Sequence, residues 1–174
     1  YLDAWRAAPD GPEGAAVATQ ARIALEAAAE RARSLHANTA AVTYYQQALS
    51  VTSDPAERAS LQLRAAIPAE AALGAEAVET LVRTAMAWYE ETGDLAASDR
   101  AAVILARALL AGSRASEALA LLAPVLARID DATAGAFDAS VTNEYARAML
   151  FDLHGADALG PIERGLRIAE HVGA

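Results

Sequence analysis

A pattern of four small and apolar side chains recurs at a spacing of about forty residues, and it constrains the fold more than any other feature of this chain. In each copy the four positions lie at offsets 0, 4, 7 and 8, so they share one face of an α-helix. A helix pair of this size cannot bury its apolar face alone, and the copies are therefore expected to stack into a solenoid. The copies are Ala41-Tyr45-Ala48-Leu49, Val78-Val82-Ala85-Met86, Ala118-Leu122-Val125-Leu126 and Ala158-Ile162-Gly165-Leu166.

The composition favours closely packed helices over a β-rich core. Of the 174 residues 49 are alanine, the best helix former and a poor strand residue, and only 5% are aromatic. A hydrophobic content of 55% excludes intrinsic disorder, and no uncharged apolar run reaches the roughly 18 residues of a membrane span. We therefore predict an all-α protein, a right-handed α-solenoid of about four antiparallel helix pairs, with units 12–53, 54–93, 94–131 and 132–174.

Charge and cysteine content exclude several function classes. The net charge is −9, which argues against direct binding of nucleic acid, because affinity there comes mainly from neutralising phosphates. The absence of cysteine removes disulfides, thiolate metal sites and cysteine nucleophiles together, and it fits a cytoplasmic protein.

Local signals place several helix ends. Asn38 is a candidate N-cap, and Asp54-Pro55 combines a capping side chain with a proline suited to the first helical turn. Gly93 can adopt the left-handed conformation that ends a helix. Pro68 and Pro124 fall inside helical patterns, where Pro68 is expected to kink or interrupt its helix and Pro124 to bend its helix.

The first eleven residues look different from the repeats. Pro9-Asp10-Gly11-Pro12 is a strong helix break, and the chain begins with Tyr1 instead of methionine. We interpret residues 1–11 as the tail of a preceding element, and the chain as a piece of a longer protein.

No constellation of catalytic or metal-binding residues emerges. His36, His154 and His171 lie far apart, whereas a zinc site needs clustered ligands and a catalytic histidine needs a positioned partner. Asp130-Asp131 with Asp138 lacks the alternation and the central glycine of a calcium loop, so helix capping is the favoured interpretation. We expect no catalytic residue, no metal and no cofactor in these residues, and hence a chain that is not itself an enzyme.

The spacings resemble those of tetratricopeptide repeats, a family built from helix pairs with a small residue midway in each first helix. Ala106 and Ala146 match that small position, and Ala29 and Ala66 would take it in the first two copies. The resemblance covers roughly residues 20–174, although the family's tryptophan and the proline after its second helix are mostly missing. It implies a module that binds proteins.

The start of the chain carries a narrower resemblance. Tyr1–Ala7, Asp10–Glu13 and Arg31–Leu35 look like the beginning of the helical-repeat region of large bacterial signalling regulators. In those proteins the region follows an ATPase domain, and some members carry a nucleotide cyclase domain while others have a helix-turn-helix output. The resemblance implies a role in signalling or transcription regulation.

The tetratricopeptide resemblance also implies which residues line the concave groove. Three of the implied groove residues are arginines. Because guanidinium groups bind carboxylates in a bidentate manner, a groove with these arginines would suit an acidic peptide. Alternatively, the arginines pair with local acids such as Asp99 and Glu144. The implied residues are Arg100, Val103, Arg107 and Leu110 in the third copy, and Ser140, Asn143, Arg147 and Leu150 in the fourth.

Two functions remain open at this point. The first is a scaffold that binds a protein or peptide partner, or neighbouring domains of the same chain, without contacting nucleic acid or membrane. The second is a sensor that holds a small molecule in the groove. The last helix still shows Ile162, Leu166 and Ile168, so pairing with another copy into a homodimer is a further option.

Overall fold

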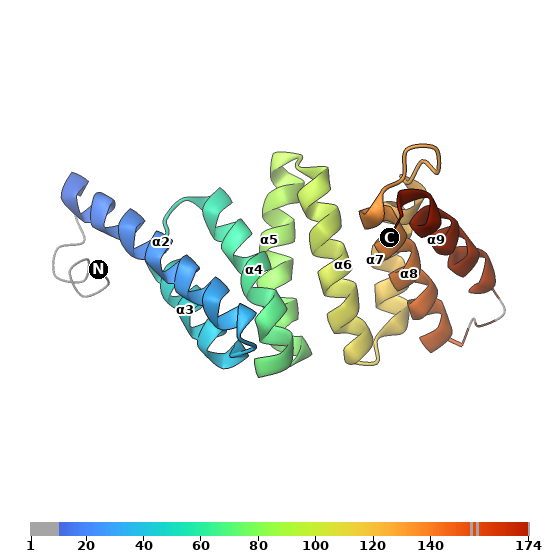
Figure 1. Cartoon of the computed structure of the whole chain (residues 1–174), viewed down its shortest axis with the longest axis horizontal. Coiled ribbons are helices and arrows are strands. Elements are labelled where there is room, and N and C mark those ends of the chain that lie inside the picture. Colours follow the sequence, from blue (N-terminus) through green and yellow to red (C-terminus); the bar gives the residue numbers. More distant parts are fainter. Residues whose placement is uncertain (1–10, 154, 156, 174) are drawn as a thin grey trace. The chain divides into compact units, whose positions relative to one another are not determined.

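The computed structural model describes residues 11–153, 155 and 157–173, and this part of the chain folds into α-helices without a strand (Figure 1). The all-α, solenoid-type fold class predicted from the sequence is confirmed. The predicted tail lies almost entirely in residues 1–10, outside the described residues. The helices are α2 (Gly11–Ser34), α3 (Asn38–Ser50), α4 (Pro55–Leu73), α5 (Ala75–Thr92), α6 (Leu95–Ala111), α7 (Ala115–Ala127), α8 (Ala136–Phe151) and α9 (Leu159–Val172).

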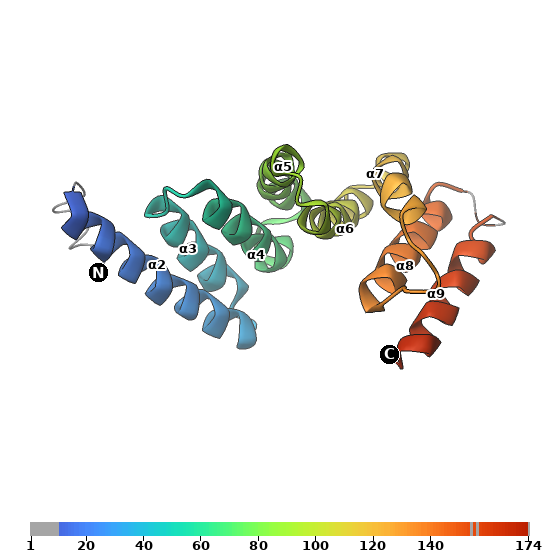
Figure 2. The same ribbon diagram turned by 90° about the horizontal axis from the view of Figure 1, so that it is seen from above.

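The chain separates into two compact units, the first ending at Ser98 and the second beginning at Asp99. In the first unit α2 packs against α3, α3 against α4, and α4 against α5. In the second unit α7 packs against α8 and α8 against α9 (Figure 2). Each unit is thus a stack in which helices that follow one another in the sequence lie side by side.

The residues of the sequence pattern form the core of these stacks. Small side chains allow the helix axes to approach closely, and the larger ones fill the space beside them. All the alanines assigned to the small position of a first helix are buried, as are all the residues that begin a second-helix pattern. These residues are Ala29, Ala66, Ala106 and Ala146 in the first helices, and Ala41, Val78, Ala118 and Ala158 in the second helices.

Two predicted helix ends are confirmed and one is wrong. The Asp54 carboxylate accepts a hydrogen bond from the backbone N–H of Glu57 at 2.8 Å and so caps α4. Gly93 ends α5 in the left-handed conformation, with φ of +74°. Asn38, in contrast, is the first residue of α3, and the capping position is held by Ala37 without a side-chain hydrogen bond.

The two interior prolines do not interrupt their helices. Pro68 lies in the continuous helix α4 and Pro124 in the continuous helix α7. A proline removes one backbone N–H donor, and packing can offset this loss where the ring is buried, as it is for Pro68. Pro124 lies near the C-terminal end of α7, where few further turns depend on it. The interruption considered for Pro68 is therefore wrong, while the kink at Pro68 and the bend at Pro124 stay predictions.

None of the helices in residues 11–153, 155 and 157–173 is long and apolar enough to cross a membrane.

Candidate functional site

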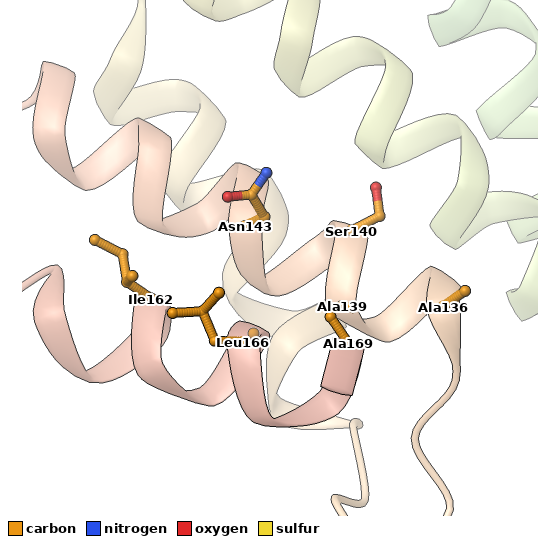
Figure 3. A pocket seen from close by; sticks show the side chains of 8 residues that line it. Ala136, Ala139, Ser140, Asn143, Ile162, Leu166 and Ala169 are labelled. Atoms are coloured by element: carbon orange, nitrogen blue, oxygen red, sulfur yellow. The ribbon is translucent and has the colours of Figure 1, made fainter. Parts of the chain in front are cut away.

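A hollow of about 470 Å³ lies along the α8–α9 helix pair (Figure 3). Its lining residues recur every three or four positions on each helix, so one face of α8 and one face of α9 form its walls. The lining is mostly apolar, with two polar side chains from α8. The residues are Ala136, Ala139, Ser140 and Asn143 on α8, and Ile162, Gly165, Leu166 and Ala169 on α9.

Two residues explain the shape of this hollow. Gly165 lies over the Thr142 side chain, whose methyl carbon would be 3.5 Å from a Cβ added to the glycine, so α8 and α9 approach closely here. Leu166 leaves 59% of its surface exposed. The hollow is consequently an open trough with an apolar wall and not an enclosed cavity.

A buried carboxylate lies beside the trough, between two arginines. Arg107 on α6 donates from Nε to Glu144 Oε1 at 2.7 Å and from Nη2 to Ser140 Oγ at 3.3 Å. Glu144 is only 5% exposed. Arg147 Nη2 lies 3.0 Å from Glu144 Oε2, but this oxygen accepts no well-oriented hydrogen bond within the described residues. The arrangement neutralises a buried charge and joins α6 to α8.

Two of the three arginines predicted for the groove therefore form ion pairs within the chain. Arg107 and Arg147 both contact Glu144, as the alternative of local pairing anticipated. Asp99, the other acid named there, forms an ion pair with Arg128. Arg100 is exposed on α6.

The apolar groove candidates have different environments. Val103 and Leu110 on α6 are buried and contribute to packing within the described structure. Leu150 on α8 is exposed, and Asn143 lines the trough. The α9 wall was missed as a binding surface, although the offsets that placed Ile162 on a helix face could have indicated it.

A second polar cluster, which sequence reasoning missed, connects α2, α3 and α4 in the first unit. Tyr45 Oη donates to Glu30 Oε1 at 2.5 Å, and Arg64 Nη2 donates to the same oxygen at 3.0 Å. Arg64 Nη1 also donates to Glu26 Oε2 at 2.6 Å, and its guanidinium lies 5.6 Å from the centroid of the Tyr45 ring. All three helices supply partners, two from α2 and one each from α3 and α4, so the cluster fixes how the three helices are rotated about their axes.

These contacts shift two titrations in opposite directions. The hydrogen bond from Tyr45, followed in effect by the bonds from Arg33 and Arg64, lowers the pKa of Glu30 to about 2 against the opposing effect of burial. Burial, reinforced by the hydrogen bond to Glu30, raises the pKa of Tyr45 to about 12. The carboxylate and the neutral phenol are thus the stable forms, and the cluster has the character of a structural network.

A smaller hollow of about 370 Å³ lies along α4 and α5 beside the half-buried Trp88. Its basic lining residue Arg58 donates from Nη1 to the carbonyl oxygens of Leu49 at 2.7 Å and Thr52 at 2.8 Å. The guanidinium therefore holds the end of α3, which leaves this hollow without an available cationic anchor at that position.

The residues considered for metal binding do not come together. Within the described part of the chain, no group of three or more histidine, aspartate or glutamate side chains could hold a metal ion. Asp138 Oδ2 instead accepts the backbone N–H of Gly135 at 2.8 Å, and Asp131 accepts from Arg164 Nε at 2.7 Å. His36 follows α2 and His171 lies in the last turn of α9, while His154 is outside the described residues.

Comparison with known proteins places the fold. No protein-family profile matches the sequence, and no curated protein does. Two crystal structures of the nearly identical TPR-like repeats of a protein from Podosopora anserina, described as a kinesin light chain, are similar to this chain. The first has a TM-score of 0.74 at 18% identity and covers 90% of this chain and 82% of the other. The second has a TM-score of 0.73 at 18% identity and covers 91% and 84%. The chain has a TPR-like helical-repeat fold.

Proposed function

We propose that this chain is a non-catalytic protein-interaction module whose α8–α9 surface receives a polypeptide partner. The observation that carries the proposal is the concentration of exposed apolar side chains on this helix pair, where Leu166 forms one wall of the trough. Leu150 and Leu159 are exposed on the same two helices. A concentration of exposed apolar side chains is typical of an interaction site, and TPR-like repeats generally bind proteins.

The polar residues of the surface indicate the chemistry of the partner. Ser140 and Asn143 provide hydrogen-bonding groups in the trough, and Arg147 lies on the same helix with 44% of its side chain exposed. Because a guanidinium offers five donors, Arg147 can bind a second carboxylate while it remains beside Glu144. An acidic peptide or an acidic side chain of a partner therefore suits this surface.

The small-molecule sensor is the second candidate. Its support is the volume of about 470 Å³, which lies within the range of ligand pockets. Such pockets bury most of their ligand, whereas the trough is open along Leu166. The open shape favours a polypeptide over a metabolite.

The wider setting of the module follows from the resemblance of Tyr1–Ala7 and Arg31–Leu35 to bacterial signalling regulators. We infer a cytoplasmic scaffold of about four repeat units (12–53, 54–93, 94–131 and 132–174) that holds an ATPase-type switch until a partner shifts the balance. Sequencing of the full reading frame tests this setting. A frame that encodes only helical repeats would remove its basis.

Site-specific photo-crosslinking tests the interaction itself. A photoreactive phenylalanine at Leu166 should give a discrete crosslinked product in lysate of the source organism, and the Arg147→Glu change should reduce that product. The control carries the same photoreactive residue at Leu35, which is exposed after α2. Equal products at both positions, or none at either, would contradict a partner site on α8–α9.

The non-catalytic part of the proposal has its own test. The isolated chain is assayed for nucleotide hydrolysis and cyclisation, and no turnover is expected. Turnover that disappears after a single side-chain substitution would show that the chain is an enzyme.

A further inference from the structure

The burial of the repeated pattern shows what kind of element fits the α8–α9 surface. Within the first unit α4 covers α3, and within the second unit α8 covers α7. The pattern residues Tyr45 on α3 and Leu122 on α7 are completely buried in this way. The equivalent residue on α9, Ile162, is only partly buried, and Leu166 is 59% exposed while its counterpart Leu126 is partly buried. The exposed residues of the α8–α9 surface thus stand at the positions that a following helix covers on α3 and α7.

A charge pair joins successive first helices at the same position in both units. Glu30 on α2 binds Arg64 on α4, and Arg107 on α6 binds Glu144 on α8. In both pairs the earlier residue directly follows the small residue of its helix, and the later residue precedes the small residue of the next helix by two positions. The small residues are Ala29 and Ala66 in the first unit, and Ala106 and Ala146 in the second.

Arg147 occupies the equivalent position on α8, whereas the equivalent residue on α4 is the apolar Ile67. Arg147 directly follows Ala146, so it stands on α8 where Glu30 stands on α2 and Arg107 stands on α6. A helix that covers the α8–α9 surface in the same way would bring to Arg147 the residue two positions before its own small residue. That residue has to be acidic to complement a guanidinium.

The covering helices share one further feature. The residue five positions before the small residue is apolar and buried in each of them, Leu61 in α4 and Val141 in α8. A covering helix therefore carries the order apolar, any, any, charged, any, small. In a helix that covers the α8–α9 surface, the charged residue is an acid, because it faces Arg147.

We propose that the α8–α9 surface binds an amphipathic α-helix of a partner, and that this helix has an apolar residue, an acidic residue three positions later and a small residue two positions after the acid. The acidic side chain pairs with Arg147, and the apolar residue packs against Ile162 and Leu166 (Figure 3). This deepens the proposed function and rests on it. A second copy of the chain fits poorly in this role, because its first helix α2 has Ala27 two positions before Ala29 and lacks the acid.

The probe is a peptide with the sequence of α8, Ala136–Phe151, which makes this contact on the α6–α7 pair in the chain itself. A hydrocarbon staple replaces Asn143 and Arg147 in the peptide, two exposed positions one turn apart, so that the peptide is helical in solution, as circular dichroism verifies. Fluorescence anisotropy measures its binding to the full chain. The wild-type chain should bind it, the Arg147→Glu chain should bind it at least about tenfold more weakly, and a peptide with Glu144→Arg should recover binding to that variant.

Matched controls separate the outcomes. Arg31→Glu makes the same charge change on an exposed residue of α2 and should alter the affinity less than about twofold, whereas Leu166→Asp should weaken it as strongly as Arg147→Glu. Failure of the helical peptide to bind, or equal binding to the Arg147→Glu and wild-type chains, overturns the proposal. Binding of an extended Gly-Ser peptide with the same number of acids, in place of the helix, would keep the surface as a protein site and refute the helical partner. Concentration-dependent dimerisation that Leu166→Asp abolishes would assign the surface to a second copy and also overturn it.

Discussion

Replacement of Tyr45 by phenylalanine tests the network that joins α2, α3 and α4. The change removes one hydroxyl group from a completely buried ring and leaves the volume of the ring nearly unchanged, so no large cavity forms. The lost interaction is the 2.5 Å hydrogen bond to Glu30, and bonds to charged acceptors contribute about 1.5–3 kcal/mol. Because Glu30 keeps Arg64 and Arg33 and is 36% exposed, we expect the lower end, a loss of about 1.5 kcal/mol in the free energy of unfolding at pH 7.

The pH dependence gives this prediction its sharper form. The pKa of Glu30 is lowered from 4.5 to about 2 in the folded chain, so its contribution to stability is complete above pH 4.5 and is lost as the pH falls from 4.5 towards 2. For a fully buried group, a pKa shift of this size would contribute about 3 kcal/mol to the free energy of unfolding. Because the Glu30 carboxylate is 36% exposed, solvent screening reduces this contribution to about 1 kcal/mol. Without the Tyr45 hydroxyl the pKa of Glu30 should rise towards its ordinary value. The difference in stability between wild type and variant should therefore shrink below pH 4.5.

Urea denaturation followed by circular dichroism at pH 7, 5 and 3.5 measures both effects. The control is Tyr44→Phe, the same substitution at the neighbouring, partly buried tyrosine, for which we expect a change below about 0.5 kcal/mol. A Tyr45→Phe effect that is equal at all three pH values would refute the assignment of the hydrogen bond to an ionised Glu30. So would equal effects of the two substitutions.

Three further predictions concern single contacts, each measured by urea denaturation at pH 7. Arg107→Met should destabilise the chain by about 2 kcal/mol because it leaves the Glu144 carboxylate buried with one poorly aligned partner. Adding Glu144→Met to this variant should recover most of the lost stability. If the effects of the two substitutions simply add, Arg107 and Glu144 do not stabilise the fold as a pair. His36→Gly should stabilise by about 0.5–1 kcal/mol, since His36 has φ of +57° and glycine adopts this conformation without strain; a loss of stability would show a contact that outweighs it. Asp54→Ala should cost about 1 kcal/mol through the lost cap on Glu57, while Asp54→Asn should stay within a few tenths of wild type.

Much of the fold could be predicted from the sequence because its signals are local. The offsets 0, 4, 7 and 8 depend only on the helical period, and the positions that they mark are buried in the first three copies apart from the partly buried fourth position. Asp54 and Gly93 fulfil their predicted roles because a cap involves only neighbouring backbone groups. The interruption considered for Pro68 was wrong because the cost of one missing hydrogen bond was weighed without the packing around this residue.

The candidate site was less predictable from sequence. Arg107 and Arg147 were predicted as groove residues, and the structure places both beside Glu144. Local pairing of this kind was one of two open alternatives, and no local signal chooses between them. The choice depends on how far α6 and α8 are rotated about their axes, because one residue step turns a side chain by about 100°. The position of the charge pairs, one residue after one small alanine and two before the next, becomes visible only when the helices are stacked.

The sequence by itself determined that the chain is helical, where α4 begins and α5 ends, and which residues of the repeated pattern face a neighbouring helix. These properties follow from backbone sterics, capping and the helical period, which act over a few residues. Only the tertiary structure decided that Tyr45 binds Glu30, that Arg107 binds Glu144, and that Leu166 stays exposed. These contacts join residues that are 15 and 37 positions apart, and the burial of an apolar side chain depends on whether another helix lies against it.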